Sequence, residues 1–210
     1  IEPLFMDKLR EQFDAAGTTA KLEKLLGRIS RIKVFDPACG SGNFLVIAYK
    51  ELRKLEHQIL ERIDELAKEH QLFSESRVNI ENFYGIEIDD FPAEVAVLAL
   101  WIAKHQMNQE FQEKFNVPQR LIPLKEAGSI RNANAARIDW NDVCPNNGRQ
   151  EIYLIGNPPY MGAKRQSKEQ KADYAQVFGD RPLNKNLDYI SLWFVKGADY
   201  IQDTEAELAF

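Results

Sequence analysis

Residues 32–43 read Ile-Lys-Val-Phe-Asp-Pro-Ala-Cys-Gly-Ser-Gly-Asn, and this stretch decides the fold class. Its first four residues are typical of a short buried strand, and the small residues after Asp36 predict a tight turn. An amphipathic helix is expected to follow over 44–70. The glycines would let the backbone approach a ligand, and the helix N-terminus would favour an anionic group. Because Asp36 suits a cation, the expected ligand is zwitterionic.

Two nucleotide-binding fingerprints are incomplete in this turn. A dinucleotide fingerprint would have a third glycine at position 45, where the chain has Leu45. A phosphate-binding loop would contain Gly-Lys-Ser or Gly-Lys-Thr, and neither tripeptide occurs in the chain. A tight turn that holds no ligand is the plain structural alternative for this stretch.

Strands and helices alternate along the rest of the chain. The hydrophobic pattern predicts further strands at 82–88, 129–132 and 151–156, and the start of one at 206–210. Helices are expected over 4–31 with a break at Gly17, over 89–105, from the capping box Ser167–Gln170, and over 188–201. The 89–105 helix is apolar nearly all round and is expected to pack on most sides, whereas 106–127 is expected to be irregular. The alternation indicates a parallel α/β sheet.

Glu87 stands at the end of the predicted strand 82–88. A carboxylate at this position in doubly wound nucleotide sites accepts hydrogen bonds from ribose hydroxyls. Ile88, the next residue, would pack against an adenine face. Lone acidic strand ends are common, so this interpretation depends on the glycine turn. Together the two features predict a nucleoside ligand with an amino-acid tail.

The most specific pattern is Asn157-Pro158-Pro159-Tyr160, directly after the predicted strand 151–156. The prolines restrict the backbone and lack N–H donors, so carbonyl groups there would point outward unpaired. The side-chain oxygen of Asn157 and the carbonyl oxygen of Pro158 can both accept from one exocyclic amine. Tyr160 offers a face on which a planar base would stack. A rigid turn without a catalytic role is the structural alternative.

In this order, the three sites resemble the class I S-adenosylmethionine-dependent DNA methyltransferases that modify the N6 amine of adenine. Within this class, the chain most resembles the methyltransferase segment of fused type IIG/IIL restriction–modification polypeptides. The resemblance covers residues 32–210. It implies a Rossmann-like, doubly wound sheet, preceded by an N-terminal helical segment over residues 1–31. Because the last residues begin a strand, the catalytic domain is expected to be truncated at its C-terminus. A target recognition domain and a possible nuclease domain would then belong to the same polypeptide.

The resemblance also implies roles for individual residues. The cofactor would be S-adenosylmethionine, held by the loop at 35–45 and by two later segments, through Asp36, Pro37, Ala38, Gly40, Gly42, Asn43, Glu87, Ile88 and Asn134. Asn134 stands where many relatives have an aspartate that accepts from the cofactor's amine, and an amide oxygen can do the same. Asn157 and Pro158 would hold the target amine, and Tyr160 would stack on the flipped adenine. No metal is needed to transfer an already activated methyl group.

Charge is distributed unevenly in this acidic chain. Its 210 residues include 27 Lys and Arg against 32 Asp and Glu, a net charge of −5, so binding of nucleic acid by bulk charge alone is excluded. Between 164 and 185, however, six basic side chains oppose three acidic ones. Phosphates of double-stranded DNA are expected to contact this segment through Lys164, Arg165 and Lys168. An ordinary solvated helix is the alternative.

The remaining composition narrows the class of protein. No run of about 18 apolar residues is present, so the sequence predicts no membrane span. The two cysteines and the lack of a visible signal peptide favour the cytoplasm, here of a prokaryote. The three histidines have no metal-ligand spacing. Three alternatives stay open: a methyltransferase of RNA or protein glutamine, a nicotinamide oxidoreductase, and a non-catalytic cofactor-binding or assembly module.

Overall fold

Five parallel strands form one sheet in the part of the chain that the computed structural model describes, residues 1–67, 75–117, 129–184 and 186–210. In chain order they are β1 (Lys33–Asp36), β2 (Phe83–Glu87), β3 (Ser129–Asn132), β4 (Ile152–Ile155) and β5 (Glu207–Ala209). Their spatial order is β3-β2-β1-β4-β5, and all neighbouring pairs are parallel. The expected parallel α/β sheet is therefore confirmed.

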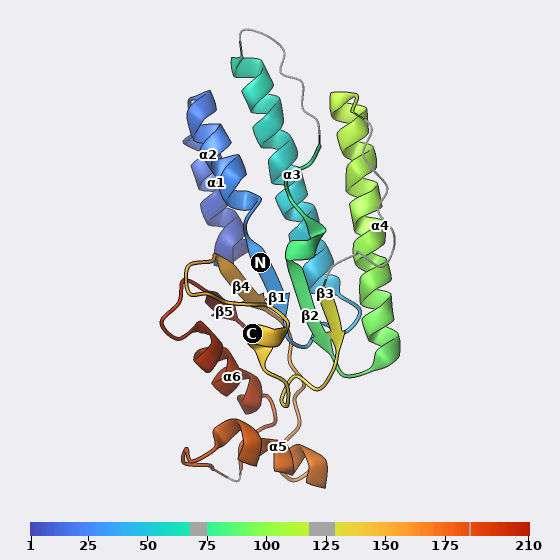
Figure 1. The fold of residues 1–210 in the computed structure, drawn as a ribbon, viewed down its shortest axis with the longest axis vertical. Helices are drawn as coiled ribbons and strands as arrows, with labels where there is room; N and C mark the ends of the chain where they lie inside the picture. Colours follow the sequence, from blue (N-terminus) through green and yellow to red (C-terminus); the bar gives the residue numbers. More distant parts are fainter. Residues whose placement is uncertain (68–74, 118–128, 185) are drawn as a thin grey trace.

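The order of the strands reverses at β1, which lies between β2 and β4 (Figure 1). Phe35 of β1 is paired with Tyr84 of β2 on one side and with Leu154 of β4 on the other. The loops after β1 and β4 therefore leave the same edge of the sheet from adjacent strands. Open parallel sheets bind their ligands at the carboxyl ends of strands at such a reversal. The glycine turn and the Asn-Pro-Pro-Tyr turn both begin there.

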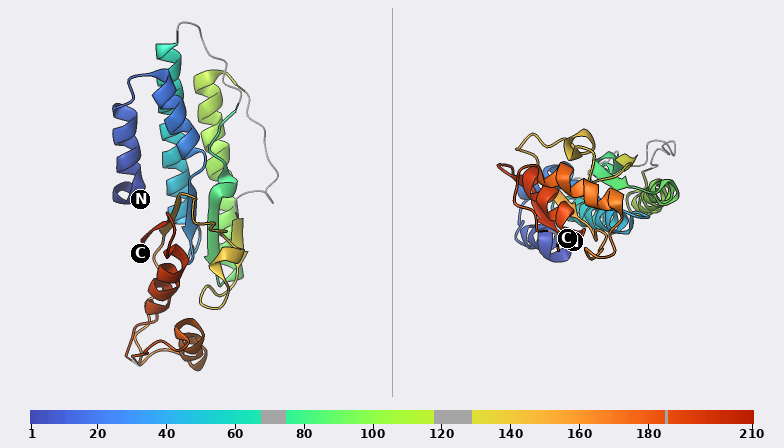
Figure 2. Two further views of the ribbon diagram at one scale, coloured as in Figure 1. Left: turned by 60° about the vertical axis from the view of Figure 1, so that its left-hand side comes forward. Right: turned by 90° about the horizontal axis from the view of Figure 1, so that it is seen from below.

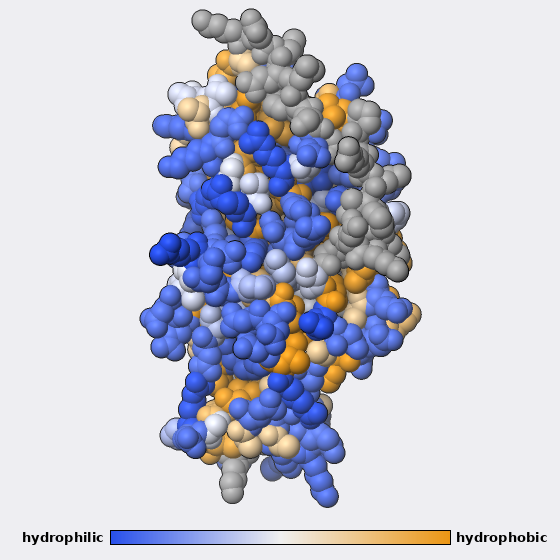
Figure 3. Space-filling view, in the orientation of Figure 1, coloured by the Kyte–Doolittle hydropathy of each residue, from blue (hydrophilic) through white to orange (hydrophobic). Residues whose placement is uncertain are grey.

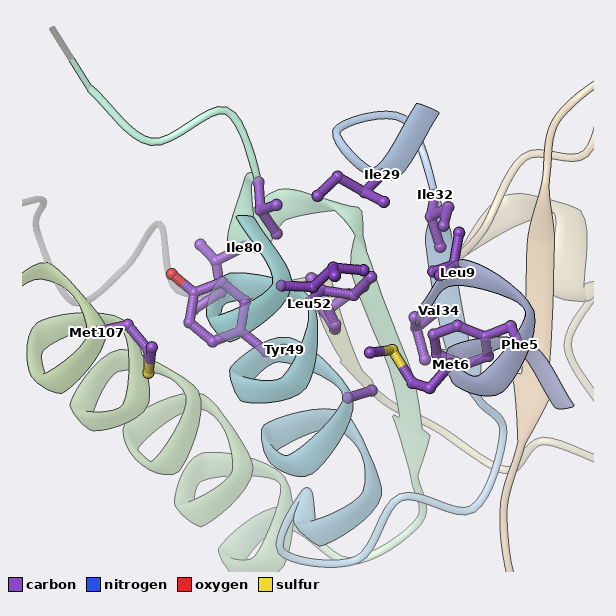
Figure 4. Close-up of a cluster of buried hydrophobic side chains, with 14 of the residues drawn as sticks. Phe5, Met6, Leu9, Ile29, Ile32, Val34, Tyr49, Leu52, Ile80 and Met107 are labelled. Atoms are coloured by element: carbon purple, nitrogen blue, oxygen red, sulfur yellow. The ribbon is translucent and has the colours of Figure 1, made fainter. Parts of the chain in front are cut away.

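One face of the sheet is covered by the N-terminal half of the chain. This layer contains the π-helical turn η1 (Glu2–Met6) and the helices α1 (Asp7–Asp14), α2 (Thr19–Ile29), α3 (Asn43–Leu66) and α4 (Asp90–Phe115), with the 3-10 turn η2 (Ile80–Asn82) leading into β2. Their apolar side chains meet in a buried cluster, in which Figure 4 shows Phe5 and Met6 beside Val34, and Leu52 between this group and Tyr49. Burial of these side chains stabilises the layer.

The opposite face is covered by α6 (Ser191–Ile201) and by the loop around the 3-10 turn η4 (Trp140–Asp142). Successive side chains of β1 point to opposite faces of the sheet, and both faces are buried. Val34 packs against the N-terminal helices, whereas Phe35 contacts Trp140 and Tyr200 on the other face. α5 (Lys168–Phe178) lies beyond the end of the sheet, at the bottom of Figure 1 and nearest the viewer in the view from below in Figure 2. Helices on both faces make the sheet doubly wound.

α4 is longer than its sequence pattern predicts. The expectation of irregular structure over 106–127 is wrong for residues 106–115, which continue the helix, while residues 118–128 lie outside the described part. The reason is tertiary packing, because Met107 is buried and the Oδ1 of Asn108 accepts from the buried guanidinium of Arg53 at 3.1 Å. These contacts hold the helix through a stretch whose own sequence is mostly polar.

α4 is also not packed on most sides, contrary to expectation. Phe91 is 76% exposed, and Leu98 and Ile102 are exposed further along the same helix. The face drawn in Figure 3 is largely hydrophilic, with hydrophobic surface at the height where the strands end in Figure 1.

Among the described residues, no helix is both long enough and apolar enough to cross a membrane.

Capping contacts confirm two of the predicted helix starts, whereas α6 begins at Ser191 and not at residue 188 as predicted. α1 and α2 are separated at Gly17, and Thr18 Oγ1 accepts from the backbone N–H of Lys21 at 3.4 Å. At α5 both bonds of the capping box form: Gln170 N–H donates to Ser167 Oγ at 3.2 Å, and Ser167 N–H donates to Gln170 Oε1 at 2.9 Å. α3 ends at Leu66, and residues 68–74 lie outside the described part.

Candidate functional site

The turn after β1 holds two glycines in left-handed backbone conformations. The φ angle is +52° at Gly40 and +81° at Gly42, a region that residues with a Cβ rarely adopt. Gly42 caps the N-terminus of α3 and lies against α4, where an added Cβ would be 3.1 Å from the Cβ of Ala96. Both glycines are thus required by the path of the turn.

Asp36 is the last residue of β1, and its side chain is fully buried. Its Oδ1 accepts a hydrogen bond from the backbone N–H of Ala38 at 2.9 Å, while Oδ2 has no partner within the described residues. Burial raises the pKa of Asp36 to about 7; the Ala38 bond opposes this, and the nearby Glu87 carboxylate adds to it. A buried carboxylate oxygen without a donor is costly, so a cation or another donor here would stabilise it.

Glu87, at the end of β2, bonds directly to the glycine turn. Its Oε2 accepts from the backbone N–H of Gly40 at 2.9 Å, and its Oε1 accepts from the backbone N–H of Asp89 at 3.0 Å. Each carboxylate oxygen has two lone pairs, so both can accept a further hydrogen bond. The next residue, Ile88, is 61% exposed and can pack on a planar group.

The Asn-Pro-Pro-Tyr turn leaves the sheet from β4, beside the glycine turn. The side chain of Asn157 is exposed, and that of Tyr160 is 67% exposed. Two bonds hold the end of the turn on the segment before α6: Met161 N–H donates to Asp188 Oδ1 at 2.9 Å, and Tyr189 N–H donates to the Met161 carbonyl at 3.0 Å. The amide and the ring are therefore presented on an anchored backbone.

One pocket of about 670 Å³ joins the three sites expected from sequence. Predicted residues from all three of them line it: Pro37, Ala38, Glu87, Ile88, Asn134 and Asn157. The other predicted cofactor and catalytic residues do not form its lining: Asp36, Gly40, Gly42, Asn43, Pro158 and Tyr160. The volume is in the range of small-molecule sites, and the lining comes from the carboxyl ends of several strands.

The pocket has a further wall that sequence reasoning missed. It is formed by side chains from the loop after β3, from α5, from the segment before α6 and from α6 itself: Arg137, Glu169, Gln170, Asp173, Tyr189 and Trp193. Trp193 donates its indole N–H to the Pro37 carbonyl at 3.0 Å, so α6 is attached to the glycine turn. Tyr189 and Trp193 are aromatic and four residues apart, and this spacing could have predicted that both are buried. The sequence around Asp173 does not predict its burial, because Asp173 is one of several charged residues in a polar helix.

The three predicted DNA-contact side chains lie on the loop and first turn leading into α5. All are exposed, and in the ranges that the structure describes none forms an ion pair: Lys164, Arg165 and Lys168. Arg181, by contrast, is paired with Asp199 at 2.6 Å, and Lys185 lies outside the described residues. The unpaired positive charge is thus gathered at the N-terminal end of α5.

His57 and the two cysteines are packing residues. His57 lies against Phe111 and Phe115, and burial lowers its pKa to about 4. Cys39 and Cys144 are buried as free thiols. Over the described residues, no group of three or more His, Cys, Asp or Glu side chains is arranged to hold a metal ion.

Known proteins share both this sequence and this geometry. The family described as "MmeI, DNA-methyltransferase domain" matches residues 12–210. DNA methyltransferase A of Bacillus subtilis (strain 168) is 53% identical over 212 residues, which cover 100% of this chain and 24% of that protein. The adenine-specific methyltransferase BrxX of Escherichia coli O9:H4 (strain HS) is 30% identical over 128 residues, 58% of this chain and 10% of that protein.

A solved structure of a restriction–modification enzyme also matches this chain. The type IIL restriction–modification enzyme MmeI, in complex with DNA, matches with a TM-score of 0.85 and 38% identity, over 99% of this chain and 28% of that one. The chain thus spans about a quarter of the length of MmeI and of the B. subtilis relative. The expected resemblance to the methyltransferase segment of restriction–modification enzymes is confirmed, and the chain belongs to the MmeI family of DNA-methyltransferase domains.

Proposed function

We propose that this chain transfers a methyl group from S-adenosylmethionine to the N6 amine of a flipped-out adenine in double-stranded DNA, as part of a larger restriction–modification polypeptide. The observation that carries the proposal is the single pocket shared by Asn157, Glu87 and Asn134. It would place a nucleoside ligand within reach of the turn that presents the amide of Asn157. The proposed division is a helical segment at 1–31 and a catalytic part at 32–210.

The residues around the pocket fit S-adenosylmethionine by their hydrogen-bonding capacity. The unpartnered Oδ2 of Asp36 suits the ammonium of the methionine part, directly or through a water, and the adjoining turn suits its carboxylate. Glu87 keeps lone pairs for the ribose hydroxyls, and the exposed Ile88 would pack on the adenine. The other proposed cofactor contacts are Pro37, Ala38, Gly40, Gly42, Asn43 and Asn134.

The catalytic contribution of the chain is positioning. S-adenosylmethionine, when bound, supplies a methyl group already activated by its sulfonium. Asn157 Oδ1 and the Pro158 carbonyl would accept the two hydrogens of the target amine, which favours a tetrahedral nitrogen with its lone pair directed at the methyl group. Tyr160, exposed beside them, would stack on the flipped base. Orienting the reactants in this way accounts for most of the rate in such a displacement.

The proposed DNA-facing surface is the N-terminal end of α5. Lys164, Arg165 and Lys168 are exposed there without ion pairs among the described residues, which suits contact with phosphates. A target recognition domain and a possible nuclease domain elsewhere in the polypeptide would supply the remaining DNA contacts. The reaction would take place in the cytoplasm of a prokaryote.

Asn157→Ala in the full-length polypeptide tests the proposal. Transfer of labelled methyl groups to duplex DNA should fall below detection, while S-adenosylmethionine binding changes little, because the amide contacts the target amine. Asn147→Ala, at another exposed asparagine, is the matched control and should methylate normally. Retained methylation by Asn157→Ala would falsify the catalytic role.

The same assay separates the alternatives. Wild-type protein offered duplex DNA, RNA and protein should methylate only the DNA, and digestion of the product should yield N6-methyladenine. Methylation of RNA or of protein glutamine instead would favour the related enzyme classes. Cofactor binding without any methyl transfer would favour a non-catalytic module, and binding of a nicotinamide dinucleotide would favour an oxidoreductase.

A further inference from the structure

A second pocket, of about 510 Å³, lies beside the continuation of the Asn-Pro-Pro-Tyr turn. Its walls come from the loop at 163–166, from α5 and from the segment before α6, and its lining includes Lys164, Gln166, Lys171, Leu183, Asn184 and Asn186. Among the described residues, it shares none of its lining with the pocket that joins Glu87 and Asn157. The proposed methyl transfer therefore leaves this second pocket without an assigned ligand.

Gln166 holds the walls of the second pocket together. It is 8% exposed, and its Nε2 donates to the carbonyl oxygens of Met161 at 2.8 Å and Leu187 at 3.1 Å. The same Leu187 carbonyl accepts from the hydroxyl of Tyr174, in α5, at 3.1 Å. Buried polar groups are costly to leave without partners, so these bonds keep the three segments in place and the pocket is preformed.

Positive charge and hydrogen-bond donors surround the second pocket. Of the described residues that line it, the charged ones are Lys164 and Lys171, and neither forms an ion pair within the described ranges. Asn184 Oδ1 accepts from the backbone N–H of Asn186 at 2.9 Å, which leaves the amide NH₂ of Asn184 to donate to a ligand. Leu183, which is 42% exposed, adds apolar surface. Two cations and an amide donor beside an apolar side chain suit a phosphate that is joined to a sugar.

The second pocket lies close in the chain to the residue proposed to stack on the flipped adenine. Ala163 lines the pocket and follows Tyr160 by three positions, which separates their Cα atoms by at most about 11 Å. Phosphates of one DNA strand follow one another every ~3.4 Å along the helix axis, so those flanking a base on Tyr160 fall within that span. Flipping rotates a nucleotide about its backbone, and contacts to the adjoining backbone would hold the strand in the flipped form.

Resting on the proposed function, we propose that the second pocket binds the phosphate and deoxyribose of a nucleotide that adjoins the target adenine. Lys164 and Lys171 pair with the phosphate, Asn184 donates a hydrogen bond to it, and Leu183 packs on the sugar. Binding is independent of base identity, since phosphate and sugar carry no direct sequence information. The proposal adds Lys171 and Asn184 to the DNA contacts expected from sequence and gives Lys164 a defined phosphate.

Neutralising single phosphates of the substrate tests this assignment. The full-length polypeptide is offered duplexes that contain its own target site, mapped from the adenines that it methylates, with a methylphosphonate in place of one phosphate. Wild-type binding should weaken on the order of tenfold when a phosphate that flanks the target adenine is neutralised. In Lys171→Ala the salt slope of DNA binding should be shallower by about 1, and the same methylphosphonate should weaken binding by less than about twofold further.

Two results of this phosphate scan would overturn the inference. One is a wild-type protein that is insensitive to neutralisation of every phosphate flanking the target adenine. The other is a set of losses that multiply at every position, because the lysine and the phosphate would then act independently.

Two other lysine variants separate the second pocket from a general effect of charge. Lys168→Ala removes a cation from the same helix but outside the lining, so its loss of binding should multiply with the methylphosphonate loss. Lys21→Ala, on the exposed side of α2, should show the wild-type profile. Coupling by Lys168→Ala as strong as that by Lys171→Ala would overturn the assignment.

Asn184→Asp tests the opposite wall of the second pocket. The carboxylate can still accept from the backbone N–H of Asn186, but it cannot donate and would repel a phosphate. DNA binding should weaken, and the methylphosphonate should weaken it less than in wild type; a loss as large as that of wild type would exclude Asn184 from the site. S-adenosylmethionine binding should not change, because the two pockets have separate linings.

Failure of this inference can be told apart from failure of the proposed function. Wild-type protein that methylates no DNA would refute the proposed function itself. Wild-type methylation together with an uncoupled phosphate scan would refute only the assignment of the second pocket.

Discussion

Gly156 lies directly against the carboxylate of Asp36: a Cβ added to Gly156 would be 2.7 Å from Asp36 Oδ1. Gly156 immediately precedes the Asn-Pro-Pro-Tyr turn after β4, and Asp36 ends β1. The two turns that begin at adjacent strands are thus in contact at their bases. Because of this contact, a substitution that displaces the Asp36 carboxylate should also displace the amide of Asn157. A substitution that displaces the backbone at Gly156 should in turn displace the Asp36 carboxylate.

Gly156→Ala should therefore affect both stability and ligand binding. The new methyl group would displace the Asp36 carboxylate or β4, at a cost of about 1–3 kcal/mol in the free energy of unfolding. Denaturant titration measures this loss, and calorimetry should show weaker S-adenosylmethionine binding. Gly162→Ala is the control, since an added Cβ there meets nothing within 4 Å. Equal stability of the two variants would contradict the contact.

Asp36→Asn should change how stability depends on pH in the absence of cofactor. The pKa of Asp36 is raised by burial from 3.8 to about 7 in the folded protein, so the folded state holds a proton that the unfolded state releases. The free energy of unfolding should then fall as pH rises from about 4 to about 7, by up to ~1.4 kcal/mol per pH unit from this group. Asparagine removes that dependence.

Denaturant titrations of both proteins at pH 5 and pH 8 check the prediction for Asp36. The stability of Asp36→Asn relative to wild type should be higher at pH 8 than at pH 5. Its affinity for S-adenosylmethionine should be lower, because the ammonium loses a charged partner. Identical pH profiles of the two proteins would show that the Asp36 carboxyl is not desolvated in the folded state.

Tyr160→Ala should impair methylation without affecting folding. The side chain is 67% exposed, so its removal should change the free energy of unfolding by less than about 0.5 kcal/mol. Stacking of a base on an aromatic ring contributes about 1–3 kcal/mol, so kcat/KM for duplex DNA should fall about 5- to 150-fold. Tyr160→Phe keeps the ring and should remain close to wild type. A similar loss in both variants would assign the effect to the hydroxyl instead.

Reversing the charges of Lys164 and Arg165 should weaken DNA binding in a salt-dependent way. If each contacts one phosphate, the slope of log affinity against log salt should become shallower by about 2 when Lys164→Glu and Arg165→Glu are combined. Lys21→Glu with Lys24→Glu, on the exposed side of α2, is the matched control. An unchanged slope in the Lys164 and Arg165 variant would exclude this end of α5 from the DNA interface.

Much of the site was predictable because its backbone is determined locally. The glycines at 40 and 42 permit left-handed backbone conformations and the prolines after Asn157 fix φ, so the two turns could be recognised without knowledge of their neighbours. The extension of α4 beyond residue 105 could not be recognised in this way. It depends on Asn108 meeting Arg53 of α3, a contact between residues 55 positions apart.

The sequence by itself determined the strands and the two turns at their ends, because these depend on local backbone preferences and hydrophobic period, and the motifs in the two turns resemble those of the family to which the chain belongs. Only the tertiary structure decided that Gly156 contacts Asp36 and that Asp173 reaches the pocket. Nothing in the local pattern distinguishes Asp173 from a solvated helix acid. Its burial against Tyr189 and Arg137 arises when α5 folds over the end of the sheet, and that long-range packing has no signature in the sequence around it.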